Sequence, residues 1–379
     1  MLATSIIPST SHVIKNSHTC SNALVQRPSP KTPKRTTQQT QQAWVVSSPG
    51  KCELRALSVP DVGPGEVMIR TFAVGLNHID WMSIDYNFCI PAFPWITGRE
   101  ASGLVEKVGP TVKDWKKGDR VWTSTYYRDS RAGCFQELVV VPKHTVNSIP
   151  SSLTFEDAAC LGVCALTAAM ALWKWLGVPM DSDASSGTEQ RETLLVWGGS
   201  TVTGQFVIQI ARCCGLEVVA VTSERTKSLA QDLGADVAIT RDHKTSEEIV
   251  SEIKAVAGAR ITRGIDCVGG RTASYALQAM STDRPSLFVP LAMLDSKVQV
   301  PKNIRVQHVE MKQFVLDPSS REYATRLNRL VESGCLRLPE IQSMGVGLSA
   351  VEAGLGMLKQ GNMGGRKLVI SMVAGARNG

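Results

Sequence analysis

A glycine- and hydroxyl-rich turn in the middle of the chain has the residue types needed to bind an anion. It follows an apolar run at 194–197 and leads into apolar residues at helical spacing, Phe206 to Ile210. The turn consists of Gly198, Gly199, Ser200, Thr201, Val202, Thr203 and Gly204. Glycines let another group approach the backbone, and the free N–H groups at a helix start favour phosphate. The turn therefore predicts a diphosphate site, although Thr201 stands where the middle glycine of a strict GxGxxG pattern would fall.

The end of the next apolar run, residues 218–221, indicates which dinucleotide binds. A site for NAD usually carries Asp or Glu about 20 residues beyond the glycines, where the carboxylate accepts a hydrogen bond from the ribose 2′-hydroxyl. Here Ser223 comes first, and the cations Arg225 and Lys227 follow. A hydroxyl and two cations suit the 2′-phosphate of NADP. The acidic residue Glu224 argues against a phosphate at this place. We predict NADP; the alternative is that these residues are solvated charges at the start of a helix.

Alternating strands and helices are expected to position this turn. The second apolar run follows Gly215, so the unit closes as a strand–helix–strand crossover of the kind that builds a parallel sheet. Further helices and strands are predicted at 227–233, 237–239, 246–256, 264–268, 272–280 and 286–289. The pattern predicts a doubly wound parallel sheet that binds its ligand at the carboxyl ends of its strands. Cys267, Leu291 and Ala292 lie at such ends and are predicted to border the nicotinamide.

The first third of the chain has a different pattern. Short strands bounded by Gly or Pro are predicted at 43–47, 67–74, 101–108, 120–124 and 135–141. Closely spaced strands favour a small β-barrel or sandwich. A last strand at 367–372 is expected to return to this domain, because a terminal strand needs a partner sheet to be stable.

Residues 1–42 are rich in Ser, Thr, Gln, Pro and Lys and lack periodicity, so we expect a disordered N-terminal extension. They contain five Lys and Arg and no acidic residue, as a mitochondrial transit peptide would, but no amphipathic helix is obvious. We therefore expect a cytoplasmic protein, with mitochondrial import as the alternative.

Composition argues against several classes of partner. Beyond residue 42 the chain carries 36 Lys and Arg against 34 Asp and Glu, and a nearly neutral body argues against nucleic acid. No run of about 18 apolar residues predicts a membrane span. The ten cysteines are scattered without a CxxC pair, which favours buried thiols in a reducing compartment, and no metal-ligand spacing is evident.

The order of these parts resembles the medium-chain dehydrogenase/reductase family over residues 43–372. The resemblance is carried by the residues at 77–81, 98–103, 108–109, 118–121, 158–160, 166–168, 198–204, 234–236 and 264–269. It implies a GroES-like β-barrel catalytic domain at 43–165, completed by 340–372, and a Rossmann NADP-binding domain at 166–339.

Within that family, the sequence departs from the zinc alcohol dehydrogenases at each catalytic ligand position, which here are Asn77, Arg99 and Val163. An amide, a guanidinium and an isopropyl group do not hold Zn²⁺. The chain is similar to the zinc-free quinone oxidoreductases and enoyl reductases, and most of all to stand-alone reductases near fungal polyketide pathways. Their usual Asn-Pro-x-Asp-Trp-Lys appears here from Asn77 to Met82 as Asn-His-Ile-Asp-Trp-Met.

The resemblance implies reduction of an activated C=C bond by hydride transfer, which depends on positioning rather than on a Lewis acid. It places residues 77–80 beside the nicotinamide, so Asn77 is a candidate to orient the ring or the substrate carbonyl; the alternative is a turn-stabilising asparagine. Asp80 is expected to hold the loop through backbone hydrogen bonds. Tyr86 is a candidate proton donor, although related enzymes often carry a tyrosine where Phe88 stands, and solvent is the alternative source.

We therefore expect a zinc-independent, NADPH-dependent reductase acting on a small-molecule or carrier-bound unsaturated carbonyl compound, as a monomer or homodimer. Two alternatives stay open. One is a quinone oxidoreductase, and the other is a non-catalytic NADPH-binding partner of a larger synthase.

Overall fold

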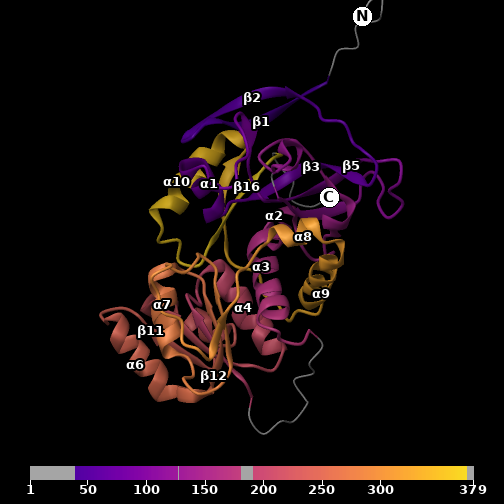
Figure 1. The fold of residues 1–379 in the computed structure, drawn as a ribbon. Helices are drawn as coiled ribbons and strands as arrows, with labels where there is room; N and C mark the ends of the chain where they lie inside the picture. The colour runs from indigo at the N-terminus through magenta and orange to yellow at the C-terminus, as the bar shows by residue number, and fades with distance from the viewer. Residues whose placement is uncertain (1–38, 127, 181–190, 374–379) are drawn as a thin grey trace, which may run out of the picture. The chain divides into compact units, whose positions relative to one another are not determined.

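A six-stranded parallel sheet forms the centre of one half of the protein. The computed structural model describes residues 39–126, 128–180 and 191–373 (Figure 1). The sheet has the order β11-β10-β9-β12-β13-β14, with every neighbouring pair parallel. Its strands are β9 (Thr193–Trp197), β10 (Glu217–Thr222), β11 (Val237–Thr240), β12 (Ile261–Asp266), β13 (Ser286–Pro290) and β14 (Ile304–Val306). The predicted doubly wound sheet is confirmed, and its strand order reverses between β9 and β12.

Helices cover both faces of this sheet, as Figure 1 shows for α6 and α7 on one face and for α3 and α4 on the other. The helices of this part of the chain are α3 (Leu166–Met170), α4 (Val202–Cys213), α5 (Lys227–Asp232), α6 (Ser246–Val256), α7 (Gly270–Ala279), α8 (Lys312–Leu316) and α9 (Arg321–Glu332). Alternate residues of β9 enter different cores: Leu194 and Val196 pack with α3, α4 and α9, whereas Leu195 and Trp197 pack with α6 and α7. Strands buried on both faces account for the continuous apolar runs in the sequence.

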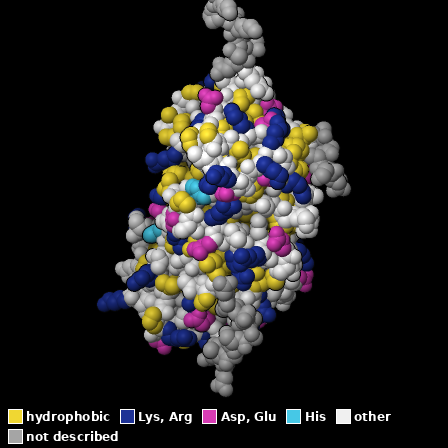
Figure 2. Space-filling model, turned by 90° about the vertical axis from the view of Figure 1, so that its right-hand side faces the viewer, with side chains coloured by type: hydrophobic (Ala, Val, Ile, Leu, Met, Phe, Trp, Pro, Cys, Tyr) yellow, Lys and Arg dark blue, Asp and Glu magenta, His cyan; other side chains and the backbone are white. Residues whose placement is uncertain are grey.

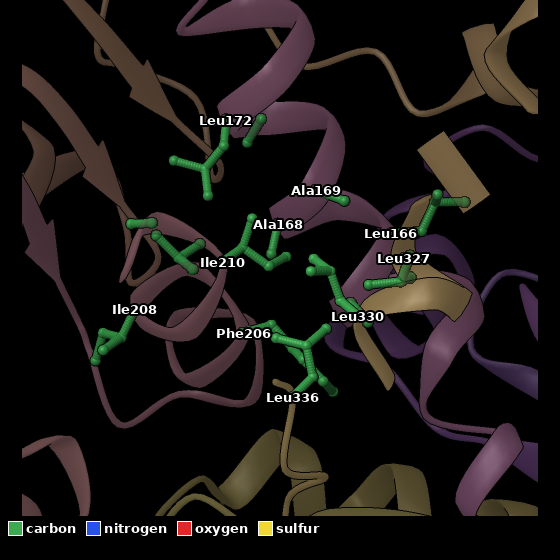
Figure 3. Close-up of a cluster of buried hydrophobic side chains, with 14 of the residues drawn as sticks. Leu166, Ala168, Ala169, Leu172, Phe206, Ile208, Ile210, Leu327, Leu330 and Leu336 are labelled. Atoms are coloured by element: carbon green, nitrogen blue, oxygen red, sulfur yellow. The ribbon is translucent and has the colours of Figure 1, made fainter. Parts of the chain in front are cut away.

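The largest of these cores lies between α3, α4 and α9 (Figure 3). The apolar residues of α9 that are buried, Ala324, Leu327, Leu330 and Val331, recur at helical spacing and face α3. The labelled side chains of α3 and α4 in Figure 3, among them Leu166, Ala169 and Phe206, are fully buried. This packing fixes α4, whose first turn follows the glycine-rich segment.

The other half is built on antiparallel strands. A seven-stranded sheet has the order β15-β16-β3-β5-β6-β8, with β7 paired to β3, and a second sheet has the order β2-β1-β4. The strands are β1 (Thr40–Ser48), β2 (Lys51–Ser58), β3 (Glu66–Gly75), β4 (Trp95–Ile96), β5 (Glu100–Val108), β6 (Arg120–Ser124), β7 (Leu138–Pro142), β8 (Val146–Ser148), β15 (Ile341–Val346) and β16 (Lys367–Ser371). The helices of this half are α1 (His78–Tyr86), α2 (Phe155–Ala158) and α10 (Val351–Gln360). The expected return of the last strand is confirmed, because β16 pairs with β3.

The predicted boundary of the N-terminal extension was wrong at its last residues. β1 begins at Thr40 and pairs with β2, and the Gln41 amide is buried and donates to Gln136 Oε1 at 2.9 Å. The polar residues at 40–42 show no apolar–polar alternation that would predict a strand. They are held in the sheet by backbone pairing and by a buried amide contact. Residues 1–38 lie outside the described residues, so their predicted disorder stays a prediction.

The apolar stretch before the parallel sheet is not one regular helix. α3 lies between two π-helical segments, Leu161–Ala165 and Ala171–Trp175. By length and composition the segment Phe155–Trp175 would suit a membrane span, but 72% of its apolar window is buried inside the protein. That burial is what a core helix shows. The described residues form one compact unit by their contacts, so the domain boundaries at 165/166 and 339/340 stay predictions.

Candidate active site

A cleft of about 760 Å³ opens at the carboxyl ends of β9, β10 and β12, with walls from both halves of the protein. The parallel-sheet half contributes the glycine-rich turn and the ends of β10, β12 and β13. The barrel half contributes residues 76–79, Trp81, Met82, Val163, Cys164 and the segment from Gly361 to Leu368. None of the described residues that line the cleft is Asp or Glu. A parallel doubly wound sheet is expected to bind its ligand at this place.

The glycine-rich turn is shaped by close backbone approaches. Gly198 has φ +89°, in the left-handed region that favours glycine. A Cβ on Gly204 would lie 2.2 Å from the carbonyl oxygen of Gly198, so only glycine lets α4 start this close to β9. The Thr201 hydroxyl caps α4 by accepting from the Gly204 N–H at 3.0 Å. The first-turn N–H groups of Val202 and Thr203 have no intrahelical partner, which suits an anion.

Most of the predicted cofactor residues line this one cleft. Those that do are Gly198, Ser200, Thr201, Val202, Thr203, Ser223, Arg225, Cys267, Leu291 and Ala292. Gly199 and Gly204 are not among the lining residues; a Cβ on Gly199 would lie 2.9 Å from the Ala220 Cβ, so it packs against β10 behind the wall. Lys227 begins α5 and does not line the cleft, so the structure does not place its charge where we predicted it.

Three arginines, Arg225, Arg241 and Arg366, line the cleft together with Ser223. The Arg225 guanidinium donates to Asn362 Oδ1 at 2.9 Å, which joins the end of β10 to the segment before β16. Glu224, the residue that argued against NADP, does not line the cleft. Arg366 was missed because it is 141 positions from Arg225 in the printed sequence, and no local motif connects the two.

The catalytic candidates lie in three different environments. Asn77 is buried, lines the cleft and immediately precedes α1. Asp80 is fully buried beneath the cleft and accepts from the Asn77 N–H at 2.9 Å, which is the local role predicted for it. Tyr86 ends α1 with 70% of its surface exposed and does not line the cleft. The structure therefore does not place Tyr86 where a proton donor would have to stand, because α1 carries it away from the cleft.

A buried ion pair lies at the inner end of the cleft, and sequence reasoning missed it. Lys367 Nζ lies 2.5 Å from Glu100 Oε1, with exposed side-chain fractions of 2% and 0%. Lys367 also donates to Asn77 Oδ1 at 2.8 Å, and Asn77 Nδ2 donates to Glu100 Oε1 at 2.8 Å. The second Glu100 oxygen accepts from the Val163 N–H at 2.7 Å. The Asn77 amide is thus held in place by Lys367 and Glu100.

Burial and charge set the protonation of these groups. Burial raises the pKa of Asp80 from 3.8 to about 7, against the opposing effect of Arg99. Burial alone would lower the pKa of Lys367, but its contacts with Cys164 and Glu100 raise it, so the ammonium is retained. Desolvation, followed by the charge on Lys367, lowers the pKa of His78. His78 lines the cleft and accepts from the Trp81 indole N–H at 3.2 Å, so a neutral imidazole is expected there.

Two family models match the chain: "Alcohol dehydrogenase GroES-like domain" over residues 63–151 and "Zinc-binding dehydrogenase" over residues 203–327. The trans-enoyl reductase tazE of Aspergillus terreus is 32% identical over 207 residues, covering 52% of this chain and 67% of that protein. The chain belongs to the medium-chain dehydrogenase/reductase family. The trans-enoyl reductase gkaC of Penicillium citrinum is 29% identical over 369 residues, covering 88% of this chain and 99% of that protein.

Solved structures of this family share the fold. A quinone oxidoreductase of Pseudomonas syringae superposes with a TM-score of 0.75 at 22% identity and covers 87% of this chain and 99% of its own. The CurK enoyl reductase superposes with a TM-score of 0.73 at 21% identity, with 89% of this chain and 100% of its own chain covered. The expected GroES-like and Rossmann architecture is therefore confirmed, in the enoyl reductase and quinone oxidoreductase branch of the family.

Membership of an oxidoreductase family supports an enzyme with a nicotinamide cofactor. The glycine-rich turn fits such a group, because a Cβ on Gly198 or Gly204 would collide with neighbouring atoms and so close the backbone cradle. The zinc implied by one model's name does not fit. Asn77, Arg99 and Val163 supply no set of zinc donors, and the part of the chain that is described contains no group of three or more His, Cys, Asp and Glu able to hold a metal.

Proposed function

We propose that this protein reduces activated C=C bonds with NADPH and without zinc. One observation carries the proposal. A single cleft joins a cationic wall without carboxylates among its described residues to an inner end lined by Asn77 and Val163, which together with Arg99 occupy the zinc-ligand positions of the zinc alcohol dehydrogenases. Within this family, that combination favours a reaction that needs positioning rather than a Lewis acid.

NADPH is favoured over NADH by the charges at the end of β10. Ser223, Arg225, Arg241 and Arg366 line this part of the cleft, and Asn362 holds the Arg225 guanidinium. A carboxylate that would accept from a free 2′-hydroxyl is absent from the described lining residues. Guanidinium groups bind a phosphate through charge-assisted hydrogen bonds, which a free hydroxyl cannot match.

When bound, the nicotinamide supplies a hydride to the β-carbon of an unsaturated carbonyl compound. Val163, Leu291 and Ala292 line the cleft with apolar surface, which limits the water that reaches the acceptor. The Lys367 ammonium beneath Asn77 is a fixed positive charge close to this end, which favours negative charge on an acceptor oxygen. Since Tyr86 does not line the cleft, we expect water to supply the proton to the α-carbon.

The acceptor class is proposed from the relatives. Several similar curated proteins carry the name trans-enoyl reductase, which favours an enoyl thioester or a related enone. A quinone is the second candidate, because the chain shares its fold with the Pseudomonas syringae quinone oxidoreductase.

Oxidation of NADPH by the purified protein tests the proposal with three acceptors: an enone, an enoyl thioester and a quinone. We expect turnover with the enoyl thioester or the enone to exceed turnover with the quinone. Faster turnover with the quinone would instead indicate a quinone oxidoreductase. Tight NADPH binding with no turnover on any acceptor would indicate a non-catalytic binding partner instead.

A further inference from the structure

Two thiols distant in sequence lie together on the far side of the parallel-sheet half. Cys213 is the last residue of α4, and Cys335 lies in the segment between α9 and β15. Cys213 Sγ lies 3.9 Å from the Cys335 carbonyl oxygen, so the two cysteines are in direct contact. Cys213 is half-buried and Cys335 is exposed. The pair therefore joins a protected thiol to an accessible one.

The two backbones are held side by side by contacts that do not involve sulfur. The Arg337 N–H donates to Gln209 Oε1 at 2.7 Å, and Gln209 Nε2 donates to the Arg337 carbonyl oxygen at 3.0 Å. The Gln209 side chain is 5% exposed. Leu336, next to Cys335, is buried in the core beside Phe206 and Leu330 (Figure 3). α4 and this segment are thus fixed against each other, so the proximity of the thiols does not depend on a loose loop.

A small cavity of about 260 Å³ gives access to the pair. It is lined by Gln209, Arg212, Cys213, Asp232, Leu233, Gly334, Cys335 and Arg337. Arg212 is paired with Asp236 at 3.1 Å and Asp232 also lines the cavity, so Arg337 is the lining cation that can attract an anionic reagent. Gly334, with φ +74°, brings the chain around at the end of α9 so that Cys335 lies against the last residue of α4. The cavity is separate from the cofactor cleft, with which it shares no lining residue.

We propose that Cys213 and Cys335 form a redox-sensitive dithiol site that reacts with disulfide oxidants and closes into a disulfide bond. The site is independent of the proposed reductase function. Its product ties the carboxyl end of α4 to the segment that leads from α9 into β15. Because α4 also carries the phosphate cradle at its other end, the disulfide couples cellular thiol status to the rigidity of the cofactor half.

The reaction with oxidised glutathione balances in two steps. The Cys335 thiolate attacks one glutathione sulfur, which forms a mixed disulfide and releases one glutathione thiolate. Cys213 then loses its proton and attacks the Cys335 sulfur, which forms the protein disulfide and releases the second glutathione. The two protein thiols are oxidised, and one glutathione disulfide is reduced to two glutathione thiols. Burial raises the pKa of Cys213 to about 11, so the exposed Cys335 attacks first.

Peptide mass spectrometry of the full-length protein after treatment with oxidised glutathione tests the site. Trypsin leaves Cys213 and its neighbour Cys214 on one peptide, so the experiment uses Cys214→Ser as the matched background. We expect the peptides 213–225 and 330–337 to appear linked without reduction and separate after reduction. Cys213→Ser should leave Cys335 as a glutathione adduct, and Cys335→Ser should abolish the link.

Thermal unfolding supplies a second readout. Closing a chain segment of 122 positions should raise the Tm of the oxidised Cys214→Ser protein by several degrees, and a reductant should reverse the rise. A persistent glutathione adduct on Cys335 in the presence of Cys213 would overturn the proposal. A link from Cys335 to another cysteine, or from Cys213 to any residue but Cys335, would overturn it as well.

Discussion

The two ends of the cleft are built in different ways. The cofactor end comes mainly from one continuous segment, from the glycine-rich turn to the end of β10, and its side chains follow a local pattern. The inner end is assembled from β16, β5 and the residues before α1, and Lys367 contacts Asn77 across 290 positions. A local pattern positions backbone groups for a phosphate, whereas a buried charge needs partners from distant strands. Substitutions at the two ends of the cleft should therefore have different effects on stability and on cofactor binding.

Lys367→Met should have the largest effect on stability. It leaves the Glu100 carboxylate buried without its cation, and removal of one partner of a buried ion pair costs about 3–5 kcal/mol of the free energy of unfolding. Chemical denaturation measures the loss. Glu100→Gln combined with Lys367→Met should recover most of it, because no unpaired charge remains.

The matched control for this prediction is Lys359→Met. Lys359 pairs with Asp85 at the surface and is largely exposed, so its loss should change the denaturation midpoint very little. If Lys367→Met were as stable as Lys359→Met, the inner end would not depend on the buried pair.

Asp80 should make the protein less stable as the pH rises. Its carboxyl group ionises near pH 4 in the unfolded chain but only near pH 7 in the folded one, because burial raises its pKa to about 7. The free energy of unfolding should therefore fall by up to about 1.4 kcal/mol per pH unit between these values and level off above them. Denaturation of wild type and Asp80→Asn over this range measures the difference, and parallel pH profiles would contradict the assignment.

Gly204→Ala should damage the cofactor end. The new Cβ would lie 2.2 Å from the Gly198 carbonyl oxygen, so α4 must shift, at a cost of about 1–3 kcal/mol. We expect weaker NADPH binding by fluorescence titration together with lower stability. Gly356→Ala in α10 is the control, since its Cβ would meet no atom within 4 Å. Unchanged NADPH affinity in Gly204→Ala would show that the glycine-rich turn is not part of the cofactor site.

Arg225→Gln should reduce discrimination between cofactors with little effect on stability. Loss of a charge-assisted hydrogen bond to the 2′-phosphate should weaken NADPH binding about tenfold and leave NADH binding unchanged. Lys227→Gln should have no effect, because Lys227 does not line the cleft. Equal losses of affinity for NADPH and NADH in Arg225→Gln would indicate that this arginine does not bind the 2′-phosphate.

The contrast also explains what could be predicted from the sequence. β9, α4 and β10 follow from apolar periodicity and turn residues, and the segment predicted at 246–256 has the bounds of α6. The contact between Glu100 and Lys367 was not predicted, because a pairing across 267 positions leaves no periodic signal. Tyr86 was chosen by its nearness to Asn77 along the chain, but the turns of α1 carry it to the surface.

The distribution of charged side chains inside the cleft could not be predicted from net charge either. Basic and acidic side chains are interspersed over the face shown in Figure 2, as a nearly neutral body predicts. Inside the cleft, however, the described lining residues include three arginines and Lys367 but no Asp or Glu. Net charge describes the whole chain, whereas recognition of a phosphate depends on the few charges that the fold brings together.

Transfer of deuterium tests the account most directly. The protein, treated with a chelator and shown to be free of zinc by elemental analysis, is incubated with the crotonyl thioester of coenzyme A and with NADPH in which both hydrogens at C4 are replaced by deuterium. We predict one deuterium at the β-carbon of the saturated product, at a rate that added zinc does not raise. Transfer that occurs only when zinc is restored, or from deuterated NADH in preference to NADPH, would contradict a zinc-independent, NADPH-dependent reductase.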